Sequence, residues 1–150
     1  MSPKKGPRTG SVRPGGSLVL DSAGLAGLAV GDAAAREAAR QVLARGGRIV
    51  VAATTLTEVL RGSRRDAAIH RVLMSATVEP VDEAVARQAG ERLGASGLDG
   101  HRCTMDPVVA VVALNCERPV LLLTSDVDDL SALTEEPERA KNERISVHRV

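Results

Sequence analysis

Residues 17–29, SLVLDSAGLAGLA, decide the fold, because a short apolar run ends at Asp21 and small helix-forming residues follow it. Leu18-Val19-Leu20 has the composition of a buried strand. Arg48 to Ala52 and Val120 to Leu123 are apolar runs of the same kind, and each precedes a helical pattern. Continuous apolar strands separated by helices indicate a mostly parallel sheet covered on both faces. We therefore expect an α/β fold of three layers, with helices on each side of a central sheet.

The helices are expected from the spacing of apolar residues and from stop signals. Asp32 to Arg45 places Ala35, Ala39 and Val42 on one face, and Gly46-Gly47 ends the pattern. Pro107 to Cys116 is ambiguous, because its valines favour a strand whereas a proline after an aspartate favours a helix start; we take the helix. Further helices are expected from Thr55 to about Gly62, over 63–74 and 82–94, and from Ser125 to about Leu133. Residues 135–144 are expected to form a charged surface connection, and 145–148 alternate like an edge strand.

The composition is that of a globular domain, with 43% hydrophobic and 26% charged residues and a net charge of +1. Residues 1–16 combine cations, prolines and glycines without an apolar period, which predicts a flexible basic arm before one domain over 17–150. The sequence shows neither a membrane-spanning stretch nor a secretory signal, so we expect a cytoplasmic protein. Cys103 and Cys116 have no metal-binding or redox spacing, which favours two reduced thiols.

Phe, Trp and Tyr are absent from the chain. Aliphatic side chains must therefore fill the core, although aromatic rings normally supply much of a core's buried area. Platforms for stacking nucleic-acid bases are missing too. If the protein binds nucleic acid, we expect the attachment to be mainly through phosphates.

Acidic residues recur where the expected strands end. Asp21 follows the first strand, Glu58 opens the helix after the second, and Asp126 follows Leu121-Leu122-Leu123-Thr124-Ser125. Carboxyl ends of parallel strands share one edge of a sheet, and ligands bind beyond that edge. Asp106, at the start of its own helix, joins the group if that helix begins near the same edge.

Each acid also has a structural interpretation. Asp21 and Asp106 fit helix caps, Thr55-Leu56-Thr57-Glu58 fits a capping box, and Asp126 suits a helix dipole. Capping explains each acid singly, but not their recurrence at one edge, where like charges repel unless a cation neutralises them. Oxygen donors without His or Cys ligands favour Mg²⁺ or Mn²⁺ over zinc. Such an ion can activate water and stabilise charge on a phosphodiester, so the acids point to phosphate-ester hydrolysis.

Four segments carry a resemblance to a known family: VLDSA at 19–23, TLTEVLRG at 55–62, MDPVVA at 105–110 and LTSDVDDL at 123–130. In this order and spacing the chain resembles the PIN domain, especially the VapC-type ribonuclease toxins of bacterial toxin-antitoxin modules. The resemblance covers most of 18–150. It differs from the family pattern at Met105 and Pro107, which flank the third acid, and at Leu130, where the family often has an aromatic residue.

The resemblance implies a PIN-like central parallel sheet and a metal-dependent endoribonuclease. It implies that Asp21 and Asp106 are the principal ligands of Mg²⁺ or Mn²⁺, that Asp126 also serves the metal, and that Glu58 completes the catalytic acids, partly through water. Asp129 and Thr124 are secondary, as a further acid and as the hydroxyl that orients the carboxylates. The implied partners are an RNA substrate, a cognate antitoxin whose tail covers the active groove, and a second copy in a homodimer.

Two other classes of function stay open at this point. One is a PIN-like module that holds RNA or a protein without cleaving, which the complete acid set disfavours. The other is a phosphotransferring α/β domain, but Ala23 stands where a phosphatase of that kind usually has its second aspartate. Ser22 and Ser125 have no evident histidine base, and His70, His101 and His148 are scattered. Arg61, Arg64 and Arg65 could steer an RNA backbone, although a solvated helix face explains each of them as well.

Overall fold

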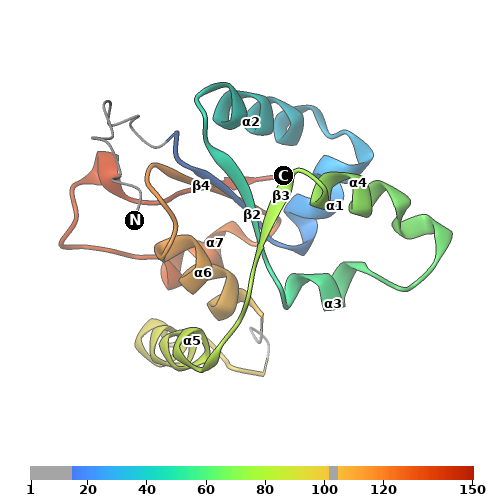
Figure 1. The fold of residues 1–150 in the computed structure, drawn as a ribbon. Coiled ribbons are helices and arrows are strands. Elements are labelled where there is room, and N and C mark those ends of the chain that lie inside the picture. Colours follow the sequence, from blue (N-terminus) through green and yellow to red (C-terminus); the bar gives the residue numbers. More distant parts are fainter. Residues whose placement is uncertain (1–14, 102–104) are drawn as a thin grey trace, which may run out of the picture.

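The computed structural model describes residues 15–101 and 105–150, and it contains one five-stranded sheet (Figure 1). Residues 1–14 of the expected basic arm, and Cys103, lie outside the described residues. The strands are β1 (Ser17–Leu20), β2 (Arg48–Ala52), β3 (Ala76–Glu79), β4 (Val120–Thr124) and β5 (Ser146–Arg149), in the spatial order β3-β2-β1-β4-β5. All the pairings are parallel. The predicted parallel sheet is therefore confirmed.

Helices cover both faces of this sheet, as the apolar strands predicted. They are α1 (Ser22–Val30), α2 (Ala33–Ala44), α3 (Thr55–Val59), α4 (Ala67–Leu73), α5 (Glu83–Ser96), α6 (Asp106–Leu114) and α7 (Val127–Leu133). Residues of α1, α2 and α4 share one core cluster with the sheet, and residues of α6 and α7 share the other. Helix α5 packs outside on α6. The result is a three-layer α/β/α domain.

Strand β1 shows how the two cores are separated. Leu18 and Leu20 belong to the cluster under α1 and α2, whereas Val19 belongs to the cluster under α6 and α7. This alternation follows from the two-residue period of a strand, and all of β1 is buried because β2 and β4 flank it and helices cover both of its faces. The central position of β1 fixes where its carboxyl end, and hence Asp21, lies.

Several boundaries differ from expectation. Strand β3 was not expected, because Ala76-Thr77-Val78-Glu79 is short and half polar, and it lies at the edge of the sheet. The helix that begins at Thr55 ends at Val59, and the helix expected over 63–74 is a 3-10 turn at 64–66 followed by α4. The ambiguous segment after Met105 is helical, as predicted.

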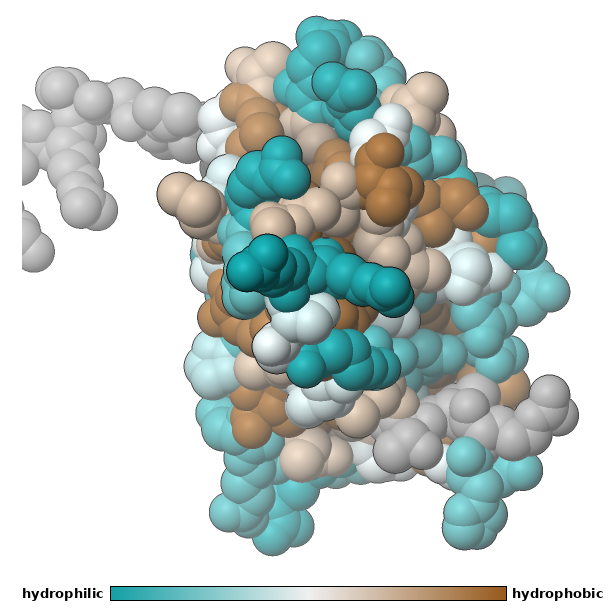
Figure 2. All heavy atoms as spheres, turned by 90° about the vertical axis from the view of Figure 1, so that its right-hand side faces the viewer, coloured by the Kyte–Doolittle hydropathy of each residue, from teal (hydrophilic) through white to brown (hydrophobic). Residues whose placement is uncertain are grey.

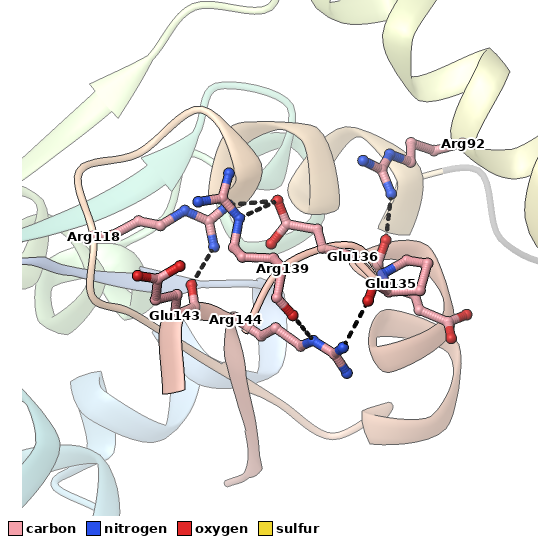
Figure 3. A network of polar contacts seen from close by, with 8 residues as sticks. Arg92, Arg118, Glu135, Glu136, Arg139, Glu143 and Arg144 are labelled. Atoms are coloured by element: carbon pink, nitrogen blue, oxygen red, sulfur yellow. Dashed lines mark hydrogen bonds and ion pairs between the residues drawn. The ribbon is translucent and has the colours of Figure 1, made fainter. Parts of the chain in front are cut away.

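The connection over 135–144 is not only a charged surface segment. Glu136 is buried there, and Arg118 and Arg139 both approach its Oε1, at 2.7 and 3.3 Å (Figure 3). Arg144 donates to the carbonyl oxygens of Pro137 and Arg139. We call these four charged residues the arginine cluster. Sequence reasoning missed it because the pairing of Glu136 with Arg118 is a tertiary contact.

No helix among the described residues is long and apolar enough to cross a membrane.

Candidate metal centre

The carboxyl edge of the sheet collects the predicted acids. Asp21 directly follows β1, Asp126 lies two residues after β4, and Glu58 lies on α3, which follows β2. Asp106 is the first residue of α6, and its electrostatic coupling to Asp126, Asp21 and Glu58 places it in the same group. All four acids predicted from the sequence therefore meet at one site.

The tightest part of the site is formed by three aspartates. One carboxylate oxygen from each of Asp106, Asp126 and Asp129 lies within 4.8 Å of the other two. Asp129 comes from the first turn of α7 and is half-buried, as is Asp106. The sequence analysis ranked Asp129 as secondary, whereas the geometry places it within this innermost group. Asp21 is not part of the triplet but lies close enough to repel Asp106.

Asp21 is held from two sides. Its Oδ1 accepts a hydrogen bond from the Gly24 backbone amide (2.8 Å), and its Oδ2 accepts one from the Thr124 hydroxyl (2.5 Å). Thr124 Oγ1 in turn accepts a hydrogen bond from the Asp126 amide (2.8 Å). Thr124 is buried and therefore links the ends of β1 and β4. The Thr124 hydroxyl thus contacts the Asp21 carboxylate, and its role in orienting the carboxylates stays a prediction.

Glycine at position 24 permits this arrangement. A Cβ there would lie 2.5 Å from the Leu123 carbonyl oxygen, so only glycine lets α1 approach β4 so closely. The same close approach brings the first turn of α1 over the end of β4, where Asp21 and Thr124 meet. The small residues of SLVLDSAGLAGLA thus serve the site as well as the helix.

Burial and repulsion by neighbouring acids disfavour the charged forms of Asp21 and Asp106. Burial, followed by the charges of Asp126, Asp21, Asp129 and Glu58, raises the pKa of Asp106 to about 6. Burial also raises the pKa of Asp21, although the hydrogen bonds from Thr124 and Gly24 oppose it. Among the described residues, no lysine, arginine or histidine forms an ion pair with Asp21, Glu58, Asp106 or Asp126. The site thus concentrates negative charge that the described part of the chain does not neutralise.

Helix capping accounts for one of the four acids. Asp21 caps α1, but the N-cap of α6 is Met105, without a side-chain bond. The N-cap of α7 is Asp126, and its side chain makes no capping bond. The capping box considered for Glu58 is wrong, because α3 begins at Thr55 after Thr54 and its cap makes no side-chain bond. Capping therefore does not explain why Asp106, Asp126 and Glu58 lie here.

The loop after Glu58 is also fixed. Asp66 is buried, and its Oδ2 accepts hydrogen bonds from the amides of Arg61 (2.9 Å) and Gly62 (2.8 Å). These backbone bonds lower the pKa of Asp66. The Arg61 guanidinium donates to the carbonyl oxygens of Thr57, Glu58 and Leu60, so it caps the end of α3. The sequence analysis missed Asp66, although a Ser63-x-x-Asp66 box was a readable signal.

The donor set fits a hard divalent cation. Carboxylate oxygens are the ligands that Mg²⁺ and Mn²⁺ prefer, and Asp106, Asp126 and Asp129 can offer theirs within one small volume. A cation bound there would offset the burial and the repulsion that together raise the pKa of Asp106. Within the described residues, the ligand group consists of carboxylates alone, and His70 and His148 lie on α4 and β5 outside it.

The order of the strands, the covering helices and the acids at the carboxyl edge define a PIN-like α/β/α domain, as the sequence motifs predicted. A similar solved structure is the crystal structure of VapBC2 from Rickettsia felis bound to a DNA fragment from their promoter. The likeness has a TM-score of 0.59 at 13% sequence identity, and it covers 88% of this chain and 98% of the compared chain. The sequence matches no family model and no curated protein.

Proposed function

We propose that the protein is a metal-dependent endoribonuclease and the toxin component of a toxin-antitoxin pair, acting in the cytoplasm. One observation carries the proposal: acids from four separate segments, Asp21, Glu58, Asp106 and Asp126, meet at the carboxyl edge of a PIN-like sheet. Acidic groups of this kind bind divalent cations, and the edge is where parallel α/β sheets bind ligands. The fold shared with a chain of the VapBC2 complex supports the toxin class.

In this proposal Asp106 and Asp126 hold Mg²⁺ or Mn²⁺ together with Asp21, and Asp129 adds a further carboxylate. When bound, the ion supplies an activated water and stabilises negative charge on the scissile phosphate. Thr124 keeps Asp21 in position through its hydroxyl. Glu58 is exposed at the rim, where its carboxylate can orient a water molecule. The RNA phosphodiester is hydrolysed directly, leaving the 5′-phosphate and 3′-hydroxyl ends that the PIN resemblance implies.

The proposal is tested by cleavage of a mixed RNA pool by the purified protein in Mg²⁺ or Mn²⁺. Cutting that disappears in EDTA and in the Asp21→Asn, Asp106→Asn double variant supports it. Glu37→Gln is the matched control, because Glu37 is an exposed acid of α2 paired with Arg40. Cutting that survives the double variant contradicts the site. RNA binding without any cutting supports the alternative, a non-cleaving PIN-like module.

The antitoxin is proposed to cover the acidic site with its tail, as the resemblance implies, and also to dock on a second groove between α1, α2 and α4. The groove encloses about 400 Å³ and is lined by apolar side chains that include Leu28, Leu43 and Val72, with Arg36 and Arg71 among its charged residues. Figure 2 looks onto the side of the molecule that carries α1 and α4, and apolar surface is visible there between hydrophilic side chains. The arginines complement a partner helix that carries both apolar and acidic residues.

This partner is tested with the product of the reading frame immediately upstream, co-expressed with the protein. Leu43→Asp in the groove should weaken the measured affinity, whereas Met74→Asp should not, because Met74 is equally apolar and more exposed but does not line the groove. Equal effects of the two variants would contradict this docking site. Sedimentation of the protein alone tests the proposed homodimer.

A further inference from the structure

The last strand brings a cation to the rim of the acidic site. Arg149 is the final residue of β5 and the register partner of Thr124 on β4. Its Nη1 donates a hydrogen bond to the carbonyl oxygen of Ser125 (2.8 Å), the residue that directly precedes Asp126. The guanidinium therefore lies beside the loop that carries one acid of the innermost triplet.

The backbone holds Arg149 in this position. The Val150 amide donates to the Thr124 carbonyl oxygen (3.0 Å), and Val150 packs on α1, where a Cβ on Gly27 would lie 2.7 Å from its Cγ2. The chain is thus anchored on both sides of Arg149, by β5 and by Val150. The hydrogen bond from Arg149 to Ser125 restrains the guanidinium itself, so less side-chain entropy is lost when the guanidinium binds a ligand.

The charge of Arg149 is available for a ligand. Arg149 is exposed, and no acid among the described residues lies within ion-pair distance of it. The guanidinium of Arg61 is less available than that of Arg149, because it already donates hydrogen bonds to three carbonyl oxygens at the end of α3. Only one guanidinium nitrogen of Arg149 bonds to Ser125, which leaves donors that can contact an oxyanion.

We infer that Arg149 binds a phosphate of the RNA strand next to the one held at the acidic site, on the β5 side. The inference rests on the proposed nuclease function, because it presumes that the acids face an RNA phosphodiester. The order of the sheet supports the placement: Glu58 follows β2, Asp21 follows β1, Asp126 follows β4 and Arg149 ends β5. Neighbouring strands lie about 4.8 Å apart, so Arg149 stands roughly one strand spacing beyond the end of β4. Without aromatic residues, the chain must hold RNA through contacts of this kind.

The test measures how salt weakens binding of a labelled single-stranded RNA in Mg²⁺. All proteins carry Asp106→Asn, so that the RNA stays uncut. Arg149→Gln should weaken binding equally for RNAs of different sequence, and the slope of log affinity against log salt should fall by about 0.7, the value for one lost phosphate contact on a single strand. Arg149→Lys should restore the slope, since it keeps the charge. Arg45→Gln is the matched control, because Arg45 is exposed at the opposite, amino edge of the sheet.

Cleavage by chains with an intact Asp106 separates a phosphate contact from a purely structural role. Arg149→Gln should raise KM for RNA and leave unchanged the Mg²⁺ concentration that gives half-maximal rate. An unchanged salt slope, or a raised Mg²⁺ requirement with unchanged KM, overturns the inference and makes Arg149 a support of the Ser125 loop. If the unsubstituted chain binds RNA but does not cleave it, the nuclease proposal fails while the salt slope still decides the role of Arg149. If it does not bind RNA, both fail.

Discussion

Two groups of carboxylates in this protein have opposite electrostatic surroundings. In the arginine cluster, buried Glu136 receives Arg118 and Arg139 on one oxygen (Figure 3). At the carboxyl edge, burial and then the charges of the neighbouring acids raise the pKa of Asp106 to about 6; these acids are Asp126, Asp21, Asp129 and Glu58. The buried acid of the arginine cluster thus has two cationic partners, whereas Asp106 has acids around it. We interpret the first group as part of the fold's stability, and under the proposed function the second group binds a divalent cation.

The largest effect expected on stability comes from the paired group. Glu136→Gln should lower the free energy of unfolding by about 3 kcal/mol, because removing one partner leaves a partly buried arginine without its counter-charge. Chemical denaturation measures this loss. Glu143→Gln is the control, since Arg118 contacts only the backbone carbonyl of Glu143. If the Glu136→Gln and Glu143→Gln variants are equally stable, the pairing of Glu136 with the arginines does not stabilise the fold.

A smaller effect is expected when the acidic site loses its orienting hydroxyl. Thr124→Val removes the donor to Asp21 and the acceptor for the Asp126 amide. Losses of this kind in the shell around a metal site typically cost about 10–100-fold in metal affinity or activity. Mg²⁺ titration of the RNA cleavage rate measures the change. Thr124→Ser keeps the hydroxyl and should retain most of the activity; a similar loss in both variants would point to packing.

Asp106→Asn should change the free energy of unfolding in the opposite direction to Glu136→Gln. Without metal at pH 7.5, removing this charge relieves repulsion and should stabilise the fold by about 1 kcal/mol, a value reduced for solvent screening because Asp106 is half-buried. The melting temperature should rise by about 3 °C. Calorimetry in EDTA measures the shift, and a destabilised variant would show that the carboxylate has a partner.

The smallest effect is a dependence on pH. Because the pKa of Asp106 in the fold lies above its unfolded value of about 3.9, the stability that the neutral carboxyl contributes is complete below about pH 4 and is lost as the pH rises to about 6. Protons and Mg²⁺ compete for the same oxygens. The rise in melting temperature caused by Mg²⁺ should therefore be full at pH 7.5 and shrink below pH 6. A rise that is the same at pH 5 and pH 7.5 would contradict binding through Asp106.

The edge of the sheet that carries the acids could be predicted from the sequence. An acid close after an apolar run with strand composition must lie near the carboxyl end of that strand, so no tertiary information is needed to place it. Asp21 and Asp126 are of this kind. Asp106 required a choice between strand and helix, and Pro107 at the start of α6 was the deciding signal. The three-layer arrangement could be predicted from the same apolar runs, because the strands of a parallel sheet that is buried on both faces are apolar throughout.

What the sequence did not predict depends on contacts between distant segments. Strand β3 is short and half polar, so its pairing with β2 rather than its composition makes it a strand. The position of Asp129 within the innermost triplet depends on where α7 begins relative to α6. The pairing of Glu136 with Arg118 joins residues that no periodicity relates.

The central position of β1 has a consequence for synthesis of the chain. Its two neighbours are β2 and β4, and the partner of Ser17 on β4 is Val120. A nascent chain that has released β1 and β2 already contains Asp21 and Glu58 but lacks Asp106, Asp126 and Asp129. The strand that carries the first acid must therefore wait, with one side unpaired, until β4 has been synthesised. A chain on the ribosome that has not yet released α6, β4 and α7 cannot assemble the acidic site, so any activity of that site begins only after these three elements have emerged.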